Sequence, residues 1–418
     1  MPASDAVIAR NPPPATRNPV MAGLCAGVAA FFLLAGYEYV RSVSTSLFIA
    51  AYSADRVPIV MALGPVGTLL FLYAYAVILS RVGPRNALVI TSLFSGAAIF
   101  ACYLAISAGS RLATGVLYVL REAYVVIIIE QYWSFINSTL TPAQASRFNG
   151  PICGIASLGS ILGAKMVNLT AVSMTSEKLL LFAAVSLVPA AACSALAFRL
   201  GGEPRPEPAE TEPHSGGLAL DLFRRNSVLV YLTLLIVLTQ VMAAVLEIRF
   251  NGLLEIARPD KDLRTEYLGA FWFYLNGVAA FLQFVVAPAL IARVRVMRLH
   301  AAFPLIHLAA CAALLVWPSL ATGAAAFLIF KSVDYSLFRA AKELLYLPLS
   351  FDARYRAKEL IDAFGYRASK GAVAGVIALA GQVLGTIPGA VFPAAALAAA
   401  TAWLGVVTRL ARHTRQSE

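Results

Sequence analysis

The sequence has little charge. Asp, Glu, Lys and Arg make up 13% of its 418 residues, about half the usual share in a soluble domain. Hydrophobic residues make up 60%, and a transmembrane helix needs roughly 20 mostly apolar residues to cross a hydrocarbon core of ~30 Å. The composition therefore argues against a soluble protein and predicts an integral membrane protein that crosses the bilayer many times.

Residues for metal, redox and hydrolytic chemistry are also scarce. The four histidines have no ligand spacing, and the five cysteines lie in apolar segments without a CxxC pair, so we expect no metal site and no disulfide. The chain has no G-x-x-x-x-G-K-[ST] loop, which argues against ATP-driven pumping by this chain alone. Without a nucleophile–base constellation, we expect neither an enzyme nor a bound cofactor.

Long apolar runs separated by helix-breaking residues fill most of the chain. We therefore expect an all-α transmembrane fold with twelve helices in two six-helix pseudo-repeats. The predicted helices cover 22–50, 57–80, 86–108, 112–138, 147–172, 178–199, 226–255, 265–292, 297–317, 319–349, 366–386 and 388–411.

One long polar stretch interrupts this pattern. Residues 201–217 are rich in Glu, Pro and Gly, a composition typical of a flexible linker. The predicted organisation is a disordered N-terminal tail at 1–20, a six-helix half at 21–199, a linker at 200–222, a second half at 223–411 and a tail at 412–418. The first 20 residues lack the apolar core of a signal peptide, so we expect the first helix to remain as an anchor.

Lys and Arg are unevenly distributed among the predicted loops. If both termini are cytoplasmic, the inner segments hold 18 of these residues and the outer segments six. The positive-inside rule then favours cytoplasmic termini, in a bacterial inner membrane. This asymmetry accounts for much of the net charge of +11, so we expect no nucleic acid as a partner. We expect membrane lipid as a partner, and we also expect a monomer.

The two predicted halves resemble each other. Arg81–Arg85 and Arg293–Arg298 are basic loops at matching places, and Glu130 and Glu343 each begin an aromatic-rich helix end. Two six-helix halves joined by a polar linker indicate the major facilitator architecture of secondary transporters.

Many ionisable residues fall at predicted membrane depth, where they are costly and usually face a cavity. Nearby pairs, such as Glu38 with Arg41 and Lys331 with Asp334, could simply neutralise each other. Nine cationic residues against six anionic ones nevertheless favour a cavity for an anionic substrate. The full set is Glu38, Arg41, Arg121, Glu122, Glu130, Lys165, Glu247, Arg249, Lys331, Asp334, Arg339, Lys342, Glu343, Arg367 and Lys370.

The segment from residue 331 to 371 resembles the ATP/ADP translocase family of plastids and intracellular bacteria. That family has Tyr-Ser-Leu-Phe, Lys-Glu and Tyr-Ile-Pro-Leu in order, and this chain has Tyr335–Phe338, Lys342-Glu343 and Tyr346–Leu349. Lys-Ala-Ala-Ile-Asp and Gly-x-Arg-x-x-Lys stretches follow in the family, matched here by Lys358–Asp362 and Gly365–Lys370. The resemblance implies an antiporter that exchanges nucleotides.

Three shorter stretches support the resemblance, namely Tyr132–Asn137, Arg147-Phe148 and Val245–Ile248. By position the resemblance implies substrate contacts for Arg41, Glu122, Glu247 and Lys358. The chain departs from the family after Arg41, where Ser42–Thr45 replace an Asp-x-Lys-Asp run, and at Asn251, where the family has a lysine. These departures leave the substrate open.

We therefore expect a secondary active transporter or antiporter of an organic anion, such as a nucleotide or phosphorylated metabolite, working by alternating access. Tyr132, Trp133 or Tyr346 could stack on a base, although anchoring at the membrane interface is the alternative role for these aromatics. The predicted substrate contacts are Arg41, Glu122, Glu247, Arg249, Lys331, Lys342 and Lys358, with Glu38, Glu130, Asp334 and Glu343 for charge balance or ion coupling.

Two other readings of the sequence remain. The chain could be a proton-coupled carrier of another solute, with Glu130 as the titrating group. It could also be a membrane partner protein that kept the fold and lost transport. An accessible central cavity lined by Arg41, Glu247 and Lys342 would favour transport, whereas a packed apolar centre would favour the partner protein.

Overall fold

The computed structural model describes residues 18–203, 223, 227–346, 349, 361 and 365–416. Within these ranges the chain is helical and contains no strand. The elements are α1 (Pro19–Tyr52), η1 (Ala54–Arg56), α2 (Val57–Ser107), α3 (Arg111–Thr139), α4 (Pro142–Met174), α5 (Ser176–Gly201), α7 (Ser227–Ala257), α8 (Lys261–Phe281), η3 (Leu282–Val286), α9 (Ala287–Arg293), α10 (Val296–Val316), α11 (Leu320–Val333), η4 (Asp334–Phe338), α12 (Arg339–Tyr346), α13 (Tyr366–Leu384) and α14 (Val391–Gln416).

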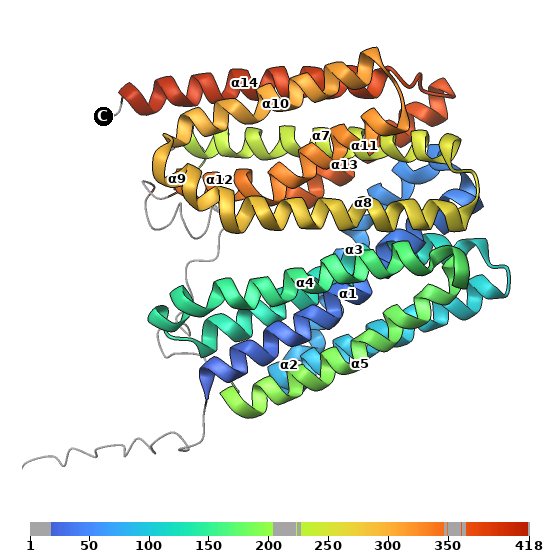
Figure 1. The fold of residues 1–418 in the computed structure, drawn as a ribbon, viewed down its shortest axis with the longest axis vertical. Coiled ribbons are helices and arrows are strands. Elements are labelled where there is room, and N and C mark those ends of the chain that lie inside the picture. Colours follow the sequence, from blue (N-terminus) through green and yellow to red (C-terminus); the bar gives the residue numbers. More distant parts are fainter. Residues whose placement is uncertain are drawn as a thin grey trace, which may run out of the picture.

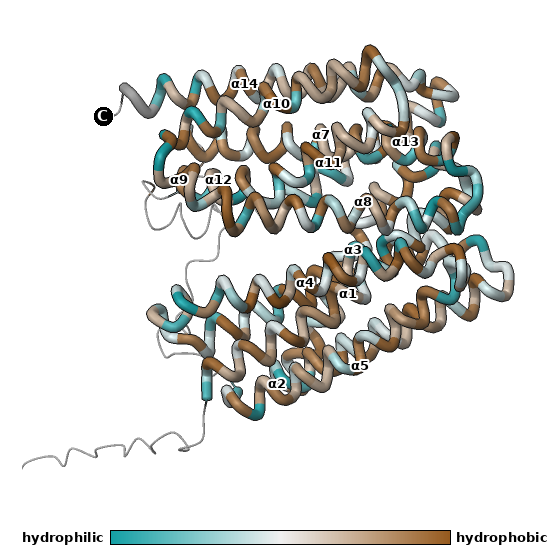
Figure 2. Tube along the Cα trace, in the orientation of Figure 1, coloured by the Kyte–Doolittle hydropathy of each residue, from teal (hydrophilic) through white to brown (hydrophobic). Residues whose placement is uncertain are grey.

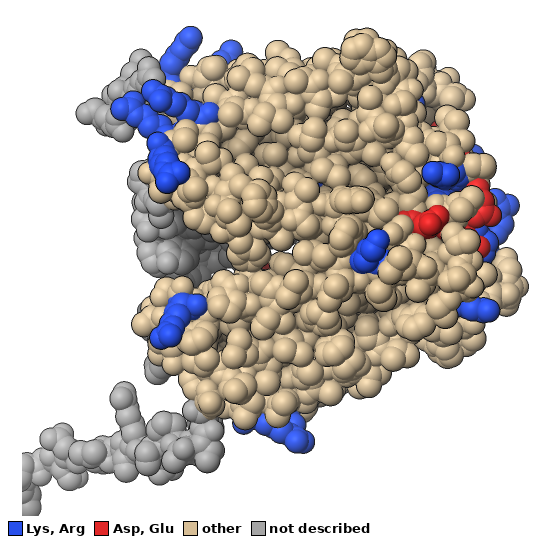
Figure 3. Space-filling model, viewed as in Figure 1, with Lys and Arg blue, Asp and Glu red and all other residues tan. Residues whose placement is uncertain are grey.

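Nine helical stretches in the described part of the chain are long and apolar enough to cross a membrane. Many of their large apolar side chains point outward, as lipid-facing residues do. On the face shown in Figure 3, charged side chains gather toward the two ends of the helices, and most of the surface between them is uncharged. The chain is therefore an integral membrane protein that crosses the bilayer several times.

Helix α2 contains two predicted helices, 57–80 and 86–108. Its 51 residues would span about 77 Å if straight, more than twice the ~30 Å hydrocarbon core. The helical path breaks at Gly83, which has φ 76° and ψ 170° and is followed by Pro84. Glycine adopts this positive φ without strain, and proline gives up one helical hydrogen bond.

Two predicted helices contain a π-helical turn. The stretch 265–292 is formed by α8, η3 and α9, and η4 lies between α11 and α12 in the stretch 319–349. A π-helical turn inserts one extra residue into an α-helix and is frequent at functional sites. The apolar pattern of the sequence contains no signal for either turn.

The helices form two packed bodies, α1–α5 and α7–α14, which Figure 1 shows one above the other. Each body has its own hydrophobic core, one drawn from residues 22–198 and the other almost entirely from residues 229–410. In Figure 2 apolar residues run along the helices of both bodies. A smaller apolar cluster, which includes Phe48, Met61, Ala244 and Ala374, joins the two bodies. We call them the N-half and the C-half.

Both halves carry their chain ends at the same end of the molecule. The N–H of Asn18, before α1, donates to the carbonyl of Leu200 at the end of α5 (3.1 Å). In the C-half, Ser227 Oγ at the start of α7 lies 2.9 Å from His413 Nε2 near the end of α14. We call this the termini end, and the opposite end, where α7 leads into α8, the far end.

At the far end, Asp260 caps helix α8. The backbone N–H groups of Asp262 and Leu263 each donate to Asp260 Oδ1 at 2.9 Å, which satisfies donors that a helix start leaves unpaired. These hydrogen bonds, with the one from Leu263 contributing most, lower the pKa of this exposed carboxyl below its ordinary value.

A charged chamber between the two halves

A polar chamber lies between the halves near the middle of the helices. It consists of two adjoining cavities of about 50 and 200 Å³, which share Glu122, Lys331, Tyr335 and Lys370 in their walls. The walls come from α1, α2 and α3 of the N-half and from α7, α8, α11, η4, α12 and α13 of the C-half. The larger cavity is nearer the termini end. Helix α7 starts at that end, and the larger cavity is lined by its Gln240, whereas the smaller one is lined by Asn251, further along the helix.

Arg121 of α3 is fixed against α1 in the N-half wall. Its Nη1 donates to the carbonyl of Arg41 (2.8 Å) and to the hydroxyls of Ser44 (2.9 Å) and Thr45, and its Nε lies 3.2 Å from Glu122 Oε1. Ser44 and Thr45 stand where the resembling family has acidic and basic residues. In this chain these positions hold an arginine from the neighbouring helix in place.

Arg41 is the second cation in the N-half wall, and its side chain is mostly buried. Its Nη1 lies 3.4 Å from Glu38 Oε1, one turn earlier on α1. Its guanidinium lies 3.2 Å from the ring centre of Trp272 on α8, a cation–π contact between the halves. Asn276 of α8 also donates to Glu38 Oε1 at 2.9 Å, so this pair connects the two halves.

The C-half wall contains a tight ion pair. Lys370 Nζ of α13 lies 2.9 Å from Glu247 Oε2 of α7, and both side chains are mostly buried. A buried pair of this kind is costly to break, because the remaining charge is left without a partner.

Other cations of the C-half are not neutralised in this way. Lys331, Arg339 and Arg367 line the chamber, and none of them forms an ion pair or hydrogen bond within the described part of the chain. Lys331 is 7% exposed, and its Nζ lies 5.0 Å from the ring centre of Tyr335. These side chains have donors that a bound anion could use.

Asp334 is the unusual carboxylate of the chamber. It is 7% exposed, lies in the π-helical turn η4, and its Oδ1 has no hydrogen-bond partner among the described residues. A buried carboxylate oxygen without a donor is costly when charged, which makes this group a candidate for protonation or ligand contact.

Cations outnumber carboxylates in the combined walls. The cations are Arg41, Arg121, Lys331, Arg339, Arg367 and Lys370, and the carboxylates are Glu122, Glu247 and Asp334. A surplus of three positive charges in an enclosed space favours an anionic ligand.

The structure brings part of the predicted site together. The chamber contains Arg41, Glu122, Glu247, Lys331 and Asp334, and Glu38 lies directly behind Arg41.

Other predicted residues lie elsewhere. The guanidinium of Arg249 contacts Gly389. Arg249 is two residues after Glu247 on α7, and side chains two apart on a helix do not face each other, so Arg249 points away from the Glu247 side of the helix. Lys342 is buried outside the chamber walls, 3.8 Å from Glu343 Oε1. Glu343 is partly exposed and Glu130 is exposed, and neither lines the chamber. Lys358 lies outside the described residues.

The structure also adds residues that sequence reasoning did not choose as substrate contacts. Arg121 and Lys370 were visible as charges at membrane depth, and Lys370 ends the Gly-x-Arg-x-x-Lys stretch, so a signal for both existed. Tyr335 begins the family-matched stretch Tyr335–Phe338, so a signal existed for it too. Trp272 had none that separated it from other aromatic residues in apolar segments. Of the predicted stacking residues, Tyr132 lies in the N-half core beside Ser194 (3.4 Å).

Hydrogen bonds close the chamber at the far end. Asp262 Oδ1 of α8 accepts from the backbone N–H of Ser176 at 2.7 Å and from its hydroxyl at 2.6 Å. Glu255 Oε2 accepts from the N–H of Ala54 (3.0 Å), and Arg264 Nη1 donates to the carbonyl of Ser46 (3.0 Å). All hydrogen bonds between described residues of the two halves involve Glu255 or α8 residues from Lys261 to Asn276.

No group of three or more His, Cys, Asp or Glu side chains with the arrangement of a metal site occurs among the described residues.

Residues 262–413 match the family of TLC ATP/ADP transporters, which confirms the resemblance expected from residues 331–371. No curated protein sequence matches the chain.

Solved structures share the fold at low sequence identity. A mutant form of the nucleoside transporter NupG has a TM-score of 0.67 and 11% identity, covering 92% of this chain and 99% of its own. An auto-inhibited POT family peptide transporter has a TM-score of 0.64 and 14% identity, with 94% and 96% covered. A bacterial homologue of the iron transporter ferroportin, in an inward-facing state, has a TM-score of 0.65 and 14% identity, with 94% and 98% covered. Residues 262–413 thus carry the sequence pattern of the TLC ATP/ADP transporters, and the chain has a fold similar to those of the three transporter structures above.

Proposed function

We propose that this protein is a secondary transporter of an organic anion, a nucleotide or phosphorylated metabolite, and that it works by alternating access. The observation that carries the proposal is the central chamber, in which six cations face three carboxylates and Lys331 has no ionic partner among the described residues. The family match over residues 262–413 supports the nucleotide class. Charged side chains are energetically costly at membrane depth, so their presence in the chamber indicates a functional role.

In this proposal the C-half holds the phosphate groups. Lys331 is buried in the chamber, and Arg339 and Arg367 line its part nearer the termini end, where a substrate entering from that end would meet them first. Arg121 is held by groups on α1, and Arg41 is held by Glu38 and Trp272. Both would supply a positive field rather than new bonds. Trp272 and Tyr335 offer aromatic faces to a base.

The Glu247–Lys370 pair would respond to the bound anion. A phosphate near Lys370 competes with Glu247 for the ammonium, so substrate binding would loosen the link between α7 and α13. Glu122 would balance charge in the empty chamber. Lys358, at a position matched by the family resemblance, stays a predicted contact, and Arg249 and Lys342 would act outside the chamber.

The wider architecture belongs to the same proposal. Each half would contribute six spans, and α2 would supply two of those in the N-half, one on either side of Gly83. Each pseudo-repeat would move as one body, with the linker at 200–222 between them. Cytoplasmic termini would make the far end periplasmic in a bacterial inner membrane, so the closed far end corresponds to a chamber that faces the cytoplasm. We propose that the protein acts as a monomer.

Uptake into proteoliposomes tests the substrate class. The purified protein is reconstituted and offered labelled ATP, ADP and AMP, with adenosine as the matched solute that lacks phosphate. The proposal expects saturable uptake of at least one nucleotide, stimulated by unlabelled nucleotide inside the vesicles if the mode is exchange. Uptake of adenosine alone, or of none of the four, would refute the anionic class.

A proton-coupled mode is favoured by one observation, the Oδ1 of buried Asp334, which has no hydrogen-bond partner among the described residues. In that mode Asp334 carries the proton, and a pH gradient drives uptake without internal substrate. Asp334→Asn would then abolish the response to the gradient while Glu130→Gln would not. If exchange proceeds equally with and without the gradient in the wild type, the coupling idea is wrong.

The alternative of a membrane partner without transport expected a packed apolar centre. The chamber contains Arg41 and Glu247 in its walls, although not Lys342. This arrangement supports transport over the partner protein.

A further inference from the structure

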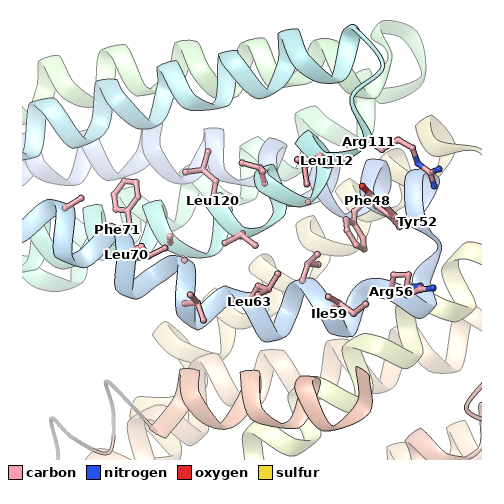
Figure 4. Close-up of a pocket in the computed structure, with 18 residues that line it drawn as sticks. Phe48, Tyr52, Arg56, Ile59, Leu63, Leu70, Phe71, Arg111, Leu112 and Leu120 are labelled. Carbon is pink, nitrogen blue, oxygen red and sulfur yellow. The ribbon is translucent and has the colours of Figure 1, made fainter. Parts of the chain in front are cut away.

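A second and larger cavity opens on the N-half, separate from the chamber. It has a volume of about 1060 Å³ and is lined by the end of α1, η1, α2 and α3. Figure 4 shows its lining side chains. None of its lining residues takes part in the chamber walls. We call it the α2–α3 groove.

The groove is apolar except at one end. Of its 18 lining residues, only Tyr52, Arg56 and Arg111 have polar side chains. Its wall residues also face the surroundings, since Leu70 is 67% exposed and Leu112 is 72% exposed. In a membrane-spanning half, an exposed apolar wall of this kind is in contact with lipid.

The two arginines lie together at the far-end mouth of the groove. Figure 4 shows them at one end, with Leu70 and Phe71 at the other. Arg111 donates to the carbonyl of Ala51, and its guanidinium lies 5.0 Å from the ring centre of Tyr52. Both arginines are exposed, and neither forms an ion pair with a described residue. The mouth therefore presents two positive charges that no described carboxylate neutralises.

The groove is longer than the depth of one bilayer leaflet. From Ile59 to Ala74 it follows α2 over sixteen residues, and the fifteen steps between them rise about 22 Å. One leaflet contributes about 15 Å, half of the ~30 Å hydrocarbon core. A chain that starts at the arginines would therefore stay in contact with the groove through a whole leaflet.

Close packing forms the floor of the groove. A Cβ added to Gly67 of α2 would come within 2.2 Å of the Val119 side chain on α3, which shows how closely the α2 backbone packs against that side chain. The side chains further toward the mouth, including Leu63 and Val116, form the walls.

We propose that the α2–α3 groove is a binding site for an anionic phospholipid. One acyl chain lies along the apolar walls, and the phosphate of the headgroup sits at the far-end mouth between Arg56 and Arg111. The charge complementarity selects an anionic headgroup, because a zwitterionic lipid brings its own cation to the two arginines. The site is independent of the transport chamber.

Native mass spectrometry of the detergent-purified full chain tests the site. Phosphatidylglycerol and phosphatidylcholine with identical acyl chains are titrated against the wild type, the variant Arg56→Gln/Arg111→Gln and the variant Val116→Trp. We expect the wild type to bind phosphatidylglycerol about thirtyfold more tightly than phosphatidylcholine, because two arginines each favour an anionic lipid by about five- to sixfold. The arginine variant should lose this preference, and Val116→Trp should weaken binding of both lipids.

Matched controls separate the site from general effects. Arg81→Gln/Arg85→Gln removes two arginines from the termini end, and Val172→Trp adds the same bulk to an exposed position of α4. Both controls should retain the wild-type preference, and inorganic phosphate at equal concentration should not displace the lipid. Equal binding of the two lipids by the wild type, or an unchanged preference in the arginine variant, would overturn the proposal. The exposed arginines make their variant informative even if Val116→Trp fails to fold.

Discussion

Removal of the Asp262 carboxylate should open the far end of the chamber. Asp262 Oδ1 accepts two hydrogen bonds from Ser176 across the halves, at 2.7 and 2.6 Å. A hydrogen bond to a charged group contributes about 1.5–3 kcal/mol. Because the Asp262 side chain is 19% exposed, solvent reduces this figure, and we take about 2 kcal/mol for both bonds together.

A bias of about 2 kcal/mol corresponds to a roughly thirtyfold change in the ratio of closed to open far ends. Asp262→Ala should therefore give a visible population with the far end open. Ser176→Ala removes only the hydroxyl bond and keeps the backbone bond, so its effect should be smaller, about fivefold for roughly 1 kcal/mol.

Double electron–electron resonance measures this population directly. Spin labels at Lys178 of the N-half and Pro259 of the C-half, in a cysteine-free background, report the separation of the halves at the far end. Asp55→Ala is the control, since this exposed carboxyl lies at the same end and makes no bond between the halves in the described part of the chain. Identical distance distributions for the wild type and Asp262→Ala, or an equal shift in Asp55→Ala, would refute the reasoning.

Four further outcomes follow from the structure. Glu247→Gln leaves Lys370 buried without its partner and should destabilise the protein by about 3–5 kcal/mol, measured as a lower midpoint of thermal unfolding in detergent. The double variant Glu247→Gln/Lys370→Met should recover most of this loss. Gly83→Ala forces a side chain to adopt φ 76° and should cost about 1–2 kcal/mol in the same assay. Asn276→Leu removes the hydrogen bond to Glu38 and should slow transport without lowering stability by more than about 1.5 kcal/mol. The pKa of Asp260 is lowered in the folded protein, so its carboxylate stabilises the fold at pH values above the unfolded-state pKa. This contribution should vanish as pH falls through the folded-state pKa. Equal stability of Asp260→Ala and the wild type between pH 5 and 7 would contradict this.

The sequence was sufficient to predict the helices and much of the charge pattern. The apolar runs are long compared with the helix-breaking segments between them, so the helix positions follow from the composition along the chain. The interruption at Gly83 was also expected, because the predicted helices end at residue 80 and restart at residue 86. The surplus of cations was also predictable, because buried charge is costly in a membrane and each such residue stands out in an apolar segment.

The details of the chamber depended on features that a one-dimensional pattern does not contain. Lys331 and Lys342 are eleven residues apart, which places them about 20° apart on a continuous α-helix. The π-helical turn η4 lies between them and shifts the later side chains by about 100°, so Lys342 lies outside the chamber. Arg121 could not be assigned to Ser44 and Thr45 either, because that contact depends on how α1 and α3 pack.

The measurement that tests the central claim most directly compares nucleotide uptake by Lys331→Gln with uptake by Arg81→Gln. Lys331 is buried in the chamber without an ionic partner among the described residues, whereas Arg81 is exposed outside the chamber walls. Loss of a charged hydrogen bond to a phosphate should reduce kcat/KM by about 10–100-fold in Lys331→Gln, with wild-type uptake in Arg81→Gln. Equal uptake by both variants and the wild type would contradict an anion site in the chamber.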